Sequence, residues 1–173
     1  TPLFIISNTS FLYQEMIEHL DVEQPVYIIK EKLAKASEMA SVCLQQIRSI
    51  QPNGPYYLMG HSYEGLVSYE IARQLHELNE QVAFLGMLDS AIPEVENRAR
   101  NKTSWYKRYQ RLKAVFKLSW GNIINFFKER IDYKLSKKFY PLLSTLDTLI
   151  NEYEVKHYAG KITVFSALYE FYR

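Results

Sequence analysis

The sequence predicts an α/β fold, with a mostly parallel β-sheet and helices on both faces. Short apolar runs alternate with longer segments whose apolar residues recur at helical spacing. The runs are almost continuously apolar, which is typical of parallel strands that are buried on both faces. With 173 residues and 47% hydrophobic residues, the chain can bury one core and has no room for two full domains.

The first predicted strand is Leu3–Ile6, and the polar loop 7–10 after it supplies an N-cap for a helix that ends near Leu20. The second predicted strand is Val26–Ile29. A helix from Lys32 to about Ile50 follows it, because apolar residues recur there at helical spacing. The sequence therefore leaves only two residues to connect this strand and helix.

The segment after the breaker cluster Pro52–Pro55 changes from strand to helix within a few residues. Residues 56–61 form an aromatic and aliphatic run, and from Tyr63 the apolar residues recur at helical spacing. Ser62 lies at the turn between them. A serine there is exposed at the end of the strand, and the next amide, that of Tyr63, faces the position of an oxyanion. The pattern predicts a nucleophile elbow with Ser62 as the nucleophile.

A nucleophile elbow usually has glycine two residues before and two residues after the serine, because the strand and the helix crowd each other at the turn. Gly60 fits this pattern, whereas Glu64 stands where the second glycine is expected. Gly65, one residue further on, can let the helix approach the sheet closely. The alternative interpretation is that Ser62 only caps the helix, and the role of Glu64 is left open.

A helix from Tyr63 to about Leu78 precedes a nearly continuous apolar strand, Val82–Leu88, and Asp89 follows that strand directly. Catalytic groups of parallel sheets gather at the carboxyl ends of the strands, and Ser62 and Asp89 occupy two such ends. A carboxylate there can orient the histidine that activates a serine and can stabilise its imidazolium form. The alternative for Asp89 is an N-cap or turn residue before Pro93.

Residues 52–65, together with residues 24–27 and 88–93, resemble the thioesterase domain that closes many nonribosomal peptide and polyketide synthases, a type I thioesterase of the α/β-hydrolase superfamily. Residues 158–167 are similar to a later strand of the same family. The resemblance implies an α/β-hydrolase fold with a helical lid insertion. It also implies a triad of serine, histidine and aspartate, in which the family places the aspartate where Asp89 stands.

The resemblance divides the chain into three expected parts. Residues 1–93 form the α/β-hydrolase core, residues 94–155 form the helical lid insertion, and residues 156–173 return to the core with a strand at 162–165. Aromatic and aliphatic residues recur at helical spacing in the insertion, which resembles the lid that covers the active site and shapes the acyl pocket. We expect the C-terminal part of the fold to be missing from the chain.

The four histidines offer no obvious base for the triad. In the family the catalytic histidine lies on a loop after a further strand, so we expect it beyond Arg173. His61 is the elbow residue beside the serine, and both His19 and His76 fall in predicted helices. His157 precedes the last predicted strand instead of following it, and is a poor candidate.

The second oxyanion donor of this fold is a backbone amide in the loop after an early strand, usually a glycine-rich loop. In this sequence the loop begins at Ser7 and contains no glycine, so Asn8 or Thr9 is the nearest candidate. Relatives carry longer connections here and after the second strand, at Lys30. We therefore expect that loop residues are absent from the chain at both places.

The positive charge of the chain is concentrated in the predicted insertion. Residues 98–138 contain thirteen Lys and Arg residues against Glu129 and Asp132, while the formal net charge of the whole chain is +2. A solvated helix face is the simplest explanation, but acyl carrier proteins are acidic, and this stretch is also suited to docking one. No nucleic-acid recognition motif accompanies the basic residues.

A single cysteine, Cys43, excludes an internal disulfide, and its apolar helical surroundings are typical of core packing. No stretch approaches the roughly 20 apolar residues of a membrane span. We expect a cytoplasmic chain without a metal site that binds neither membrane nor nucleic acid.

The resemblance implies a serine thioesterase that releases an acyl, polyketide or peptidyl chain from a carrier protein by hydrolysis or cyclisation. It implies no cofactor of its own, because the acyl or peptidyl carrier protein presents the small-molecule acyl substrate on a phosphopantetheine arm. Two alternatives remain open. A general carboxylesterase would use the same elbow without carrier docking, and a non-catalytic acyl-binding module would account for Glu64 and for the absent histidine.

Overall fold

The computed structural model of the chain describes residues 1–90, 145–146, 148–150 and 152–165. Two compact units make up the chain, one of Thr1–Ala91 with Tyr153–Arg173 and the other of Ile92–Glu152. The described residues of the second unit are helical. Most of the predicted insertion, residues 94–155, lies outside the described residues, so the three-part division of the chain stays a prediction.

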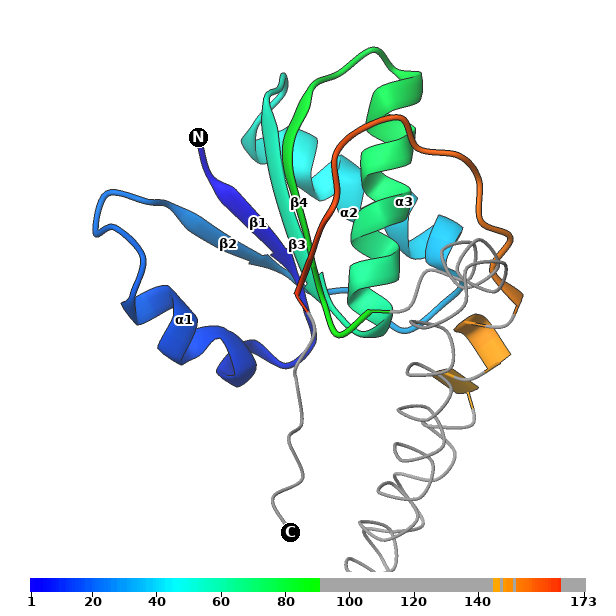
Figure 1. The fold of residues 1–173 in the computed structure, drawn as a ribbon, viewed down its shortest axis with the longest axis horizontal. Coiled ribbons are helices and arrows are strands. Elements are labelled where there is room, and N and C mark those ends of the chain that lie inside the picture. Colours follow the sequence, from blue (N-terminus) through cyan, green and yellow to red (C-terminus); the bar gives the residue numbers. More distant parts are fainter. Residues whose placement is uncertain (91–144, 147, 151, 166–173) are drawn as a thin grey trace, which may run out of the picture. The chain divides into compact units, whose positions relative to one another are not determined.

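The first unit is built on a five-stranded parallel sheet (Figure 1). Its strands lie side by side in the order β2-β1-β3-β4-β5. Their bounds are β1 Leu3–Ile6, β2 Val26–Ile29, β3 Tyr56–His61, β4 Val82–Leu88 and β5 Thr163–Phe165. Every neighbouring pair is parallel. The predicted parallel sheet and the predicted bounds of β1, β2 and β4 are confirmed, while β5 begins one residue later than predicted.

Helices cover both faces of the sheet, as predicted (Figure 1). They are the 3-10 helix η1 Ser10–Tyr13 and the α-helices α1 Gln14–Glu18, α2 Ala36–Ile50 and α3 Tyr63–Glu77. Helix α1 lies on one face, and α2 and α3 lie together on the other. Helix α3 begins directly after Ser62, so its N-terminus lies at the carboxyl end of β3.

Residues that alternate along the strands bury the two faces of the sheet. On the face covered by η1 and α1, Tyr13 forms an apolar cluster with Leu3, Ile5 and Met59. Helix α3 buries four apolar residues that recur at helical spacing: Leu66, Val67, Ile71 and Leu75. Cys43 is fully buried, and burial raises the pKa of its thiol to about 12, in keeping with a packing role.

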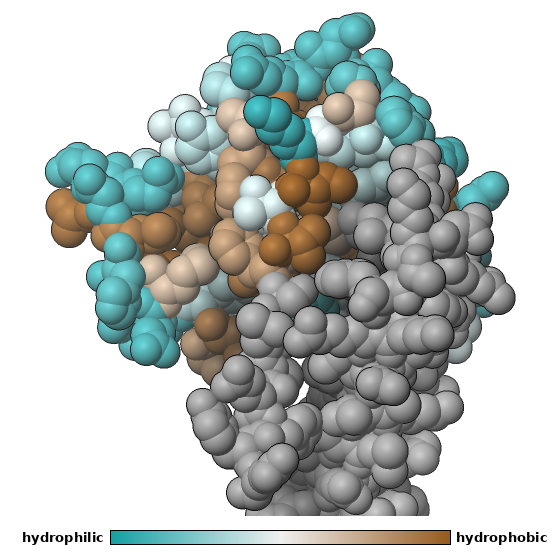
Figure 2. Space-filling model, in the orientation of Figure 1, coloured by the Kyte–Doolittle hydropathy of each residue, from teal (hydrophilic) through white to brown (hydrophobic). Residues whose placement is uncertain are grey.

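Some apolar side chains of this unit remain exposed. Figure 2 shows an apolar area in the centre of one face, with hydrophilic atoms around it. Among the described residues, the exposed large apolar side chains include Phe11 and Leu12 on η1 and Val164 and Phe165 on β5. Even so, no helix in the described part of the chain is both long and apolar enough to cross a membrane.

The second helix begins at Ala36, later than the predicted start at Lys32. The residues before it use their carbonyl groups for contacts elsewhere in the core. The Ala34 carbonyl accepts a hydrogen bond from a tyrosine hydroxyl of α3 at 2.6 Å, and the Glu31 carbonyl accepts one from the Asn8 side-chain amide at 2.8 Å. The connection between β2 and α2 is therefore longer than the two residues predicted, because tertiary contacts hold it out of the helix.

The first helix is also shorter than predicted, since η1 leads into α1 and α1 ends at Glu18. Thr9 occupies the N-cap position of η1, but its side chain makes no capping hydrogen bond. Instead, the Ser7 hydroxyl accepts a hydrogen bond from the Thr9 amide at 3.0 Å and lies 3.3 Å from the Thr9 hydroxyl. The expected side-chain cap is therefore wrong, because the polar loop bonds to itself.

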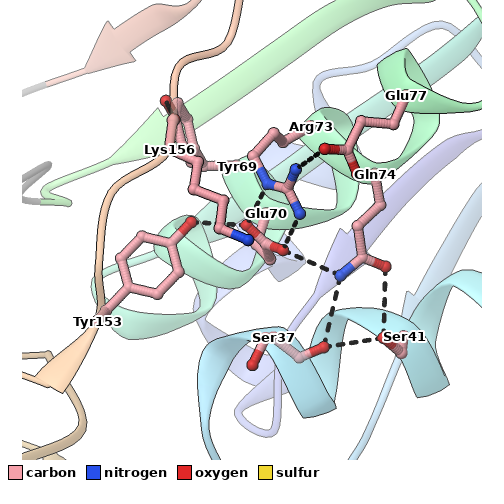
Figure 3. A network of polar contacts seen from close by, with 9 residues as sticks. All are labelled: Ser37, Ser41, Tyr69, Glu70, Arg73, Gln74, Glu77, Tyr153 and Lys156. Carbon is pink, nitrogen blue, oxygen red and sulfur yellow. Dashed lines mark hydrogen bonds and ion pairs between the residues drawn. The ribbon is translucent and has the colours of Figure 1, made fainter.

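Helix α3 is held by a buried network around Glu70 (Figure 3). Arg73 donates two hydrogen bonds to the Glu70 carboxylate, at 2.8 and 2.7 Å, and also contacts Glu77. The Tyr153 hydroxyl and the Gln74 amide donate to the same carboxylate at 2.7 and 3.0 Å. Burial alone would raise the pKa of Glu70, but these donors hold it below its ordinary value.

The segment before β5 is tied to the same helix. The Tyr69 hydroxyl donates a hydrogen bond to the Lys156 carbonyl at 2.6 Å, and the ring of Tyr158 lies edge-on to both Tyr69 and His76. Helix α3 is thus fixed along its length, and it carries Ser62 at its N-terminus.

Candidate active site

The carboxyl edge of the sheet brings the candidate residues together. Because the strands are parallel, the loop after β1, the turn after β3 and the residue after β4 lie at the same edge. Strands β1 and β3 are neighbours, but the chain leaves them in opposite directions, from β1 outward to β2 and from β3 outward to β4. This topological switch point lies between the Ser7 loop and Ser62, where ligands of open α/β sheets bind, and Asp89 is one strand further along.

Ser62 is exposed at the turn between β3 and α3, and its backbone has the unusual angles φ 54° and ψ −119°. Its amide donates a hydrogen bond to the Leu88 carbonyl of β4 at 2.8 Å. Its side chain makes no capping hydrogen bond to α3, which is the bond that the helix-cap interpretation requires. The hydroxyl is therefore not committed to the helix.

Two glycines allow β3 and α3 to meet at this turn. A Cβ added to Gly60 would lie 2.3 Å from the backbone carbonyl oxygen of Glu64. A Cβ added to Gly65 would lie 1.9 Å from Ser90 Oγ and 3.0 Å from the Gly60 carbonyl oxygen. The expectation that Gly65 permits the close approach is confirmed. Glu64 contributes its backbone to this contact, which explains how a residue with a side chain fits there.

The side chain and the backbone amide of Tyr63 have different roles. The side chain is buried, its hydroxyl donates to the Ala34 carbonyl at 2.6 Å, and burial, with the charges of Glu38 and Glu64 adding to it, raises its pKa to about 12. The backbone amide is the first of α3, and the first amides of a helix lack partners within the helix and attract negative charge. Only the amide is thus suited to an oxyanion.

Asp89 follows β4 directly and is exposed. Its backbone has a positive φ of 44°, and its amide donates a hydrogen bond to the Phe165 carbonyl of β5 at 2.8 Å. The structure therefore places Asp89 at the carboxyl end of the strand that neighbours β3, one strand away from Ser62.

Ser62 and Asp89 share an unusual backbone conformation, because both have a positive φ angle. In the described part of the chain, the residues other than glycine with a positive φ are Ser62, Asn79 and Asp89. Asn79 is an ordinary helix end, because its amide and that of Glu80 bond to the His76 and Leu75 carbonyls in a Schellman motif. The other two have no such explanation, and strained backbone of this kind gathers at functional sites.

The loop after β1 offers one amide for an oxyanion. The Ser7 amide donates to the Ile29 carbonyl at 3.0 Å, and the Thr9 amide donates to Ser7 Oγ at 3.0 Å. The Asn8 side-chain amide donates to the Glu31 carbonyl, but within the described residues the Asn8 backbone amide has no acceptor. Of the two expected candidates, Asn8 fits better than Thr9.

The four histidines all lie within the described residues, and there none of them forms a hydrogen bond with Ser62. His61 ends β3, His19 bonds to the Glu15 carbonyl at 2.8 Å, and His76 lies in the last turn of α3. His157 is exposed on the segment before β5. The same part of the chain holds no cluster of three or more His, Cys, Asp or Glu residues that could bind a metal.

Tyr13 is a residue of this edge that the sequence did not single out. It ends η1, and its side chain is 2% exposed. Burial and the charge of Glu64 raise the pKa of its hydroxyl, and the nearby Ser7 side chain and His61 backbone lower it in part. The only signal in the sequence is a tyrosine at an apolar position of the first predicted helix, which is also typical of plain packing.

A family model described as a thioesterase domain matches residues 9–157 of the chain. Among curated relatives, malpibaldin synthetase of Mortierella alpina is 40% identical over 100 residues, which cover 51% of this chain. That match spans 2% of the length of the synthetase, so the chain is similar to a small part of a much longer protein.

Solved structures with the same fold include a thioesterase domain and a nonribosomal peptide synthetase. The NocB thioesterase domain has a TM-score of 0.62 at 19% identity, and the match covers 95% of this chain and 69% of that one. The four-domain nonribosomal peptide synthetase AB3403 has a TM-score of 0.64 at 21% identity, covering 100% of this chain and 16% of that one. The α/β-hydrolase fold expected from the sequence is thereby confirmed.

Proposed function

Because the chain belongs to the thioesterase domain family, we propose that it uses Ser62 to release an acyl, polyketide or peptidyl chain from a carrier protein. The observation that carries this proposal is the conformation of Ser62. It is exposed, strained and without a capping bond, and it stands at the switch point of a parallel sheet, next to the N-terminus of α3.

The chemistry begins with attack of Ser62 Oγ on the carbonyl carbon of the thioester. A histidine takes the hydroxyl proton, and Asp89 orients that histidine and stabilises its imidazolium form. The carbonyl oxygen becomes an oxyanion that the amides of Tyr63 and Asn8 stabilise. Collapse of this intermediate breaks the carbon–sulfur bond, and the thiol leaves with the proton from the histidine. Water or a nucleophile within the substrate then attacks the acyl-serine.

The proposed base is a histidine outside these 173 residues. His19 bonds to the Glu15 carbonyl, and His76 packs against the Tyr158 ring in the last turn of α3. His157 is exposed on the segment before β5, and His61 is the last residue of β3. Asp89, at the end of β4, is the group of this chain that would receive such a histidine. The family places its histidine after a strand that follows the counterpart of β5.

The proposed partner is an acyl or peptidyl carrier protein that presents its cargo on phosphopantetheine. The basic stretch 98–138, which lies outside the described residues, is the proposed docking surface. Neutralising Lys107, Arg108 and Arg111 together should lower kcat/KM for carrier-bound substrate, less so as salt is raised, and leave a small soluble thioester unaffected. Equal slowing of both substrates at every salt concentration would instead assign these residues to folding.

Covalent labelling of the full-length protein tests the nucleophile. A fluorophosphonate should modify Ser62 and no other serine, as read by peptide mass spectrometry, and Ser62→Ala should abolish both labelling and thioester hydrolysis. Ser49→Ala, which removes an exposed hydroxyl of α2 far from the elbow in sequence, is the matched control and should change neither.

The two alternative functions give different results in the same assays. A general carboxylesterase would hydrolyse small oxygen esters as well as carrier-bound thioesters and would show no effect of the basic residues. A non-catalytic acyl-binding module would bind an acyl-pantetheine without turnover, and Ser62 would not be labelled. Either outcome would replace the thioesterase proposal.

A further inference from the structure

The Tyr13 hydroxyl is a buried polar group without a partner. Its side chain is 2% exposed, and within the described residues the oxygen has no hydrogen bond. Such a group destabilises a folded protein, because it has lost its bonds to water and gained none in return. Replacing it by phenylalanine would remove that cost, so packing alone does not explain a tyrosine at this place.

The surroundings of this hydroxyl place it beneath the candidate active site. The ring packs in the apolar cluster with Leu3, Ile5 and Met59, on the face of the sheet covered by η1 and α1. The Ser7 side chain, at the start of the oxyanion loop, and the backbone of His61, the residue before Ser62, lie close enough to this oxygen to lower the pKa of Tyr13, although neither meets it in hydrogen-bond geometry. Tyr13 therefore lies between the two segments that supply the proposed oxyanion donors.

The hydroxyl keeps its proton at any ordinary pH. Burial, with the charge of Glu64 adding to it, raises the pKa of Tyr13 to about 12. A neutral phenol is a hydrogen-bond donor, and its donor capacity is unused in this structure.

We propose that Tyr13 is a positioning residue for the oxyanion loop, and that its hydroxyl gains its hydrogen bond when residues 7–9 close on the acyl oxyanion. The acceptor within the chain is Ser7 Oγ, which already accepts from the Thr9 amide and so fixes the turn that presents the Asn8 amide. This inference rests on the proposed thioesterase function and adds to it a residue outside the triad.

A bond that is absent in the ground state and present in the transition state accelerates the reaction. Interactions that are equally strong in both states lower KM without raising kcat. The hydroxyl of Tyr13 has no hydrogen-bond partner within the described residues, and the proposed bond forms only as residues 7–9 close on the oxyanion. It therefore stabilises the transition state more than the bound substrate and contributes to kcat. The loop contains no glycine, and a donor beneath it would add to the Ser7–Thr9 bond in holding the turn that presents the Asn8 amide.

Tyr13→Phe in the full-length protein tests this proposal, because the change removes one oxygen and leaves the ring. The unfolding temperature should rise by about 2–8 °C, since an unpaired buried hydroxyl is lost. At the same time kcat for a small acyl-pantetheine thioester should fall about tenfold with KM unchanged. A packing role would leave kcat unaffected.

Tyr56→Phe is the matched control. Tyr56 is also fully buried, but its hydroxyl lies 3.2 and 3.0 Å from the Gln51 and Pro52 carbonyls, at the end of β3 opposite to Ser62. Its loss should lower the unfolding temperature and leave kcat unchanged. The two variants are thus expected to change the unfolding temperature in opposite directions, and only Tyr13→Phe is expected to lower kcat.

The outcomes separate this inference from the function on which it rests. If the wild-type protein turns over the thioester and Tyr13→Phe does so at the same rate, the inference is wrong and the function stands. If Tyr13→Phe lowers both the unfolding temperature and kcat, the hydroxyl is structural and the inference is again wrong. If the wild-type protein shows neither turnover nor labelling of Ser62, the proposed function itself fails, and the inference fails with it.

Discussion

Replacing Gly60 by alanine tests how closely β3 and α3 must approach each other at the elbow. The added Cβ would lie 2.3 and 2.5 Å from the carbonyl oxygen and carbon of Glu64 and 2.7 Å from the Gly65 nitrogen. Ordinary contacts of a Cβ begin at 3.4 Å, and all three of these atoms are backbone. The first turn of α3 must therefore move away from β3 by roughly 1 Å, since no flexible side chain can yield.

The expected cost follows from that displacement. Overpacking of a filled core costs about 1–3 kcal/mol, and the upper end applies because the strain falls on the backbone. The displaced turn also carries the Tyr63 amide, and a misplacement of about 1 Å in a catalytic group lowers the rate about 100-fold. We expect Gly60→Ala to lose about 3 kcal/mol of unfolding free energy and about 100-fold in kcat/KM.

Gly86→Ala is the matched control, because Gly86 is a buried glycine of the neighbouring strand β4. A Cβ there would meet the Phe84 ring at 2.9 Å and the Met59 methyl group at 3.1 Å, which are ends of flexible side chains. Urea unfolding should show a loss under about 1 kcal/mol, with thioester turnover nearly unchanged. Equal losses for the two variants would refute the argument that backbone crowding at the elbow sets the cost.

Three further predictions concern Glu64 and the Glu70 network. Glu64→Gly should retain thioester turnover, because only the backbone of this residue is used in the contact with β3, and a loss as large as that of Ser62→Ala would reveal a catalytic role. Tyr153→Phe removes a donor to a buried carboxylate and should lower the unfolding free energy by about 1–3 kcal/mol in urea titrations, while an unchanged midpoint would show that water replaces the tyrosine. Since the fold lowers the pKa of Glu70 from its ordinary 4.5, its contribution to stability is complete above that pH and is lost as the pH falls through the lower folded value. Unfolding midpoints measured from pH 6 to 3 should therefore fall more steeply for the wild-type protein than for Glu70→Gln, and parallel curves would contradict the assignment.

The strands could be predicted almost to the residue because each is a short apolar run bounded by polar or breaker residues. The run after Pro55 and the change of period at Tyr63 also located the elbow, since a buried parallel strand and an amphipathic helix leave different periods in a sequence. The position of Asp89 followed from the same rule, because it ends the next apolar run. These features are local, so the sequence contains all that is needed to find them.

The connection before α2 could not be predicted, because tertiary contacts decide where that helix begins. Ala34 lies in the stretch with helical period and Glu31 directly before it, yet their carbonyls accept hydrogen bonds from Tyr63 and Asn8, both distant in sequence. Local propensity is a weak prior and such contacts override it. The same contacts bring the elbow and the oxyanion loop together, so the failed prediction coincides with the candidate site.

The role of Glu70 could not be predicted for a related reason. Glu70 and Arg73 are spaced as an exposed ion pair on a helix surface would be, and periodicity alone favours that interpretation. In the structure both are buried, and Tyr153, which lies near the end of the predicted insertion, completes the hydrogen bonding of the carboxylate. A partner at that sequence distance leaves no local signal.

The two strained residues of the site are not held equally firmly. The Ser62 amide bonds to the Leu88 carbonyl of β4, a strand that spans Val82–Leu88 and is paired on both sides. The Asp89 amide bonds to the Phe165 carbonyl of β5, which has only three residues, all exposed. A short, exposed strand at the end of the described sheet opens more easily than a central one. The position of the carboxylate therefore depends on the pairing of β5, whereas the nucleophile is fixed by the centre of the sheet, and a weakened β5 would impair the activation of Ser62 before it disturbed Ser62 itself.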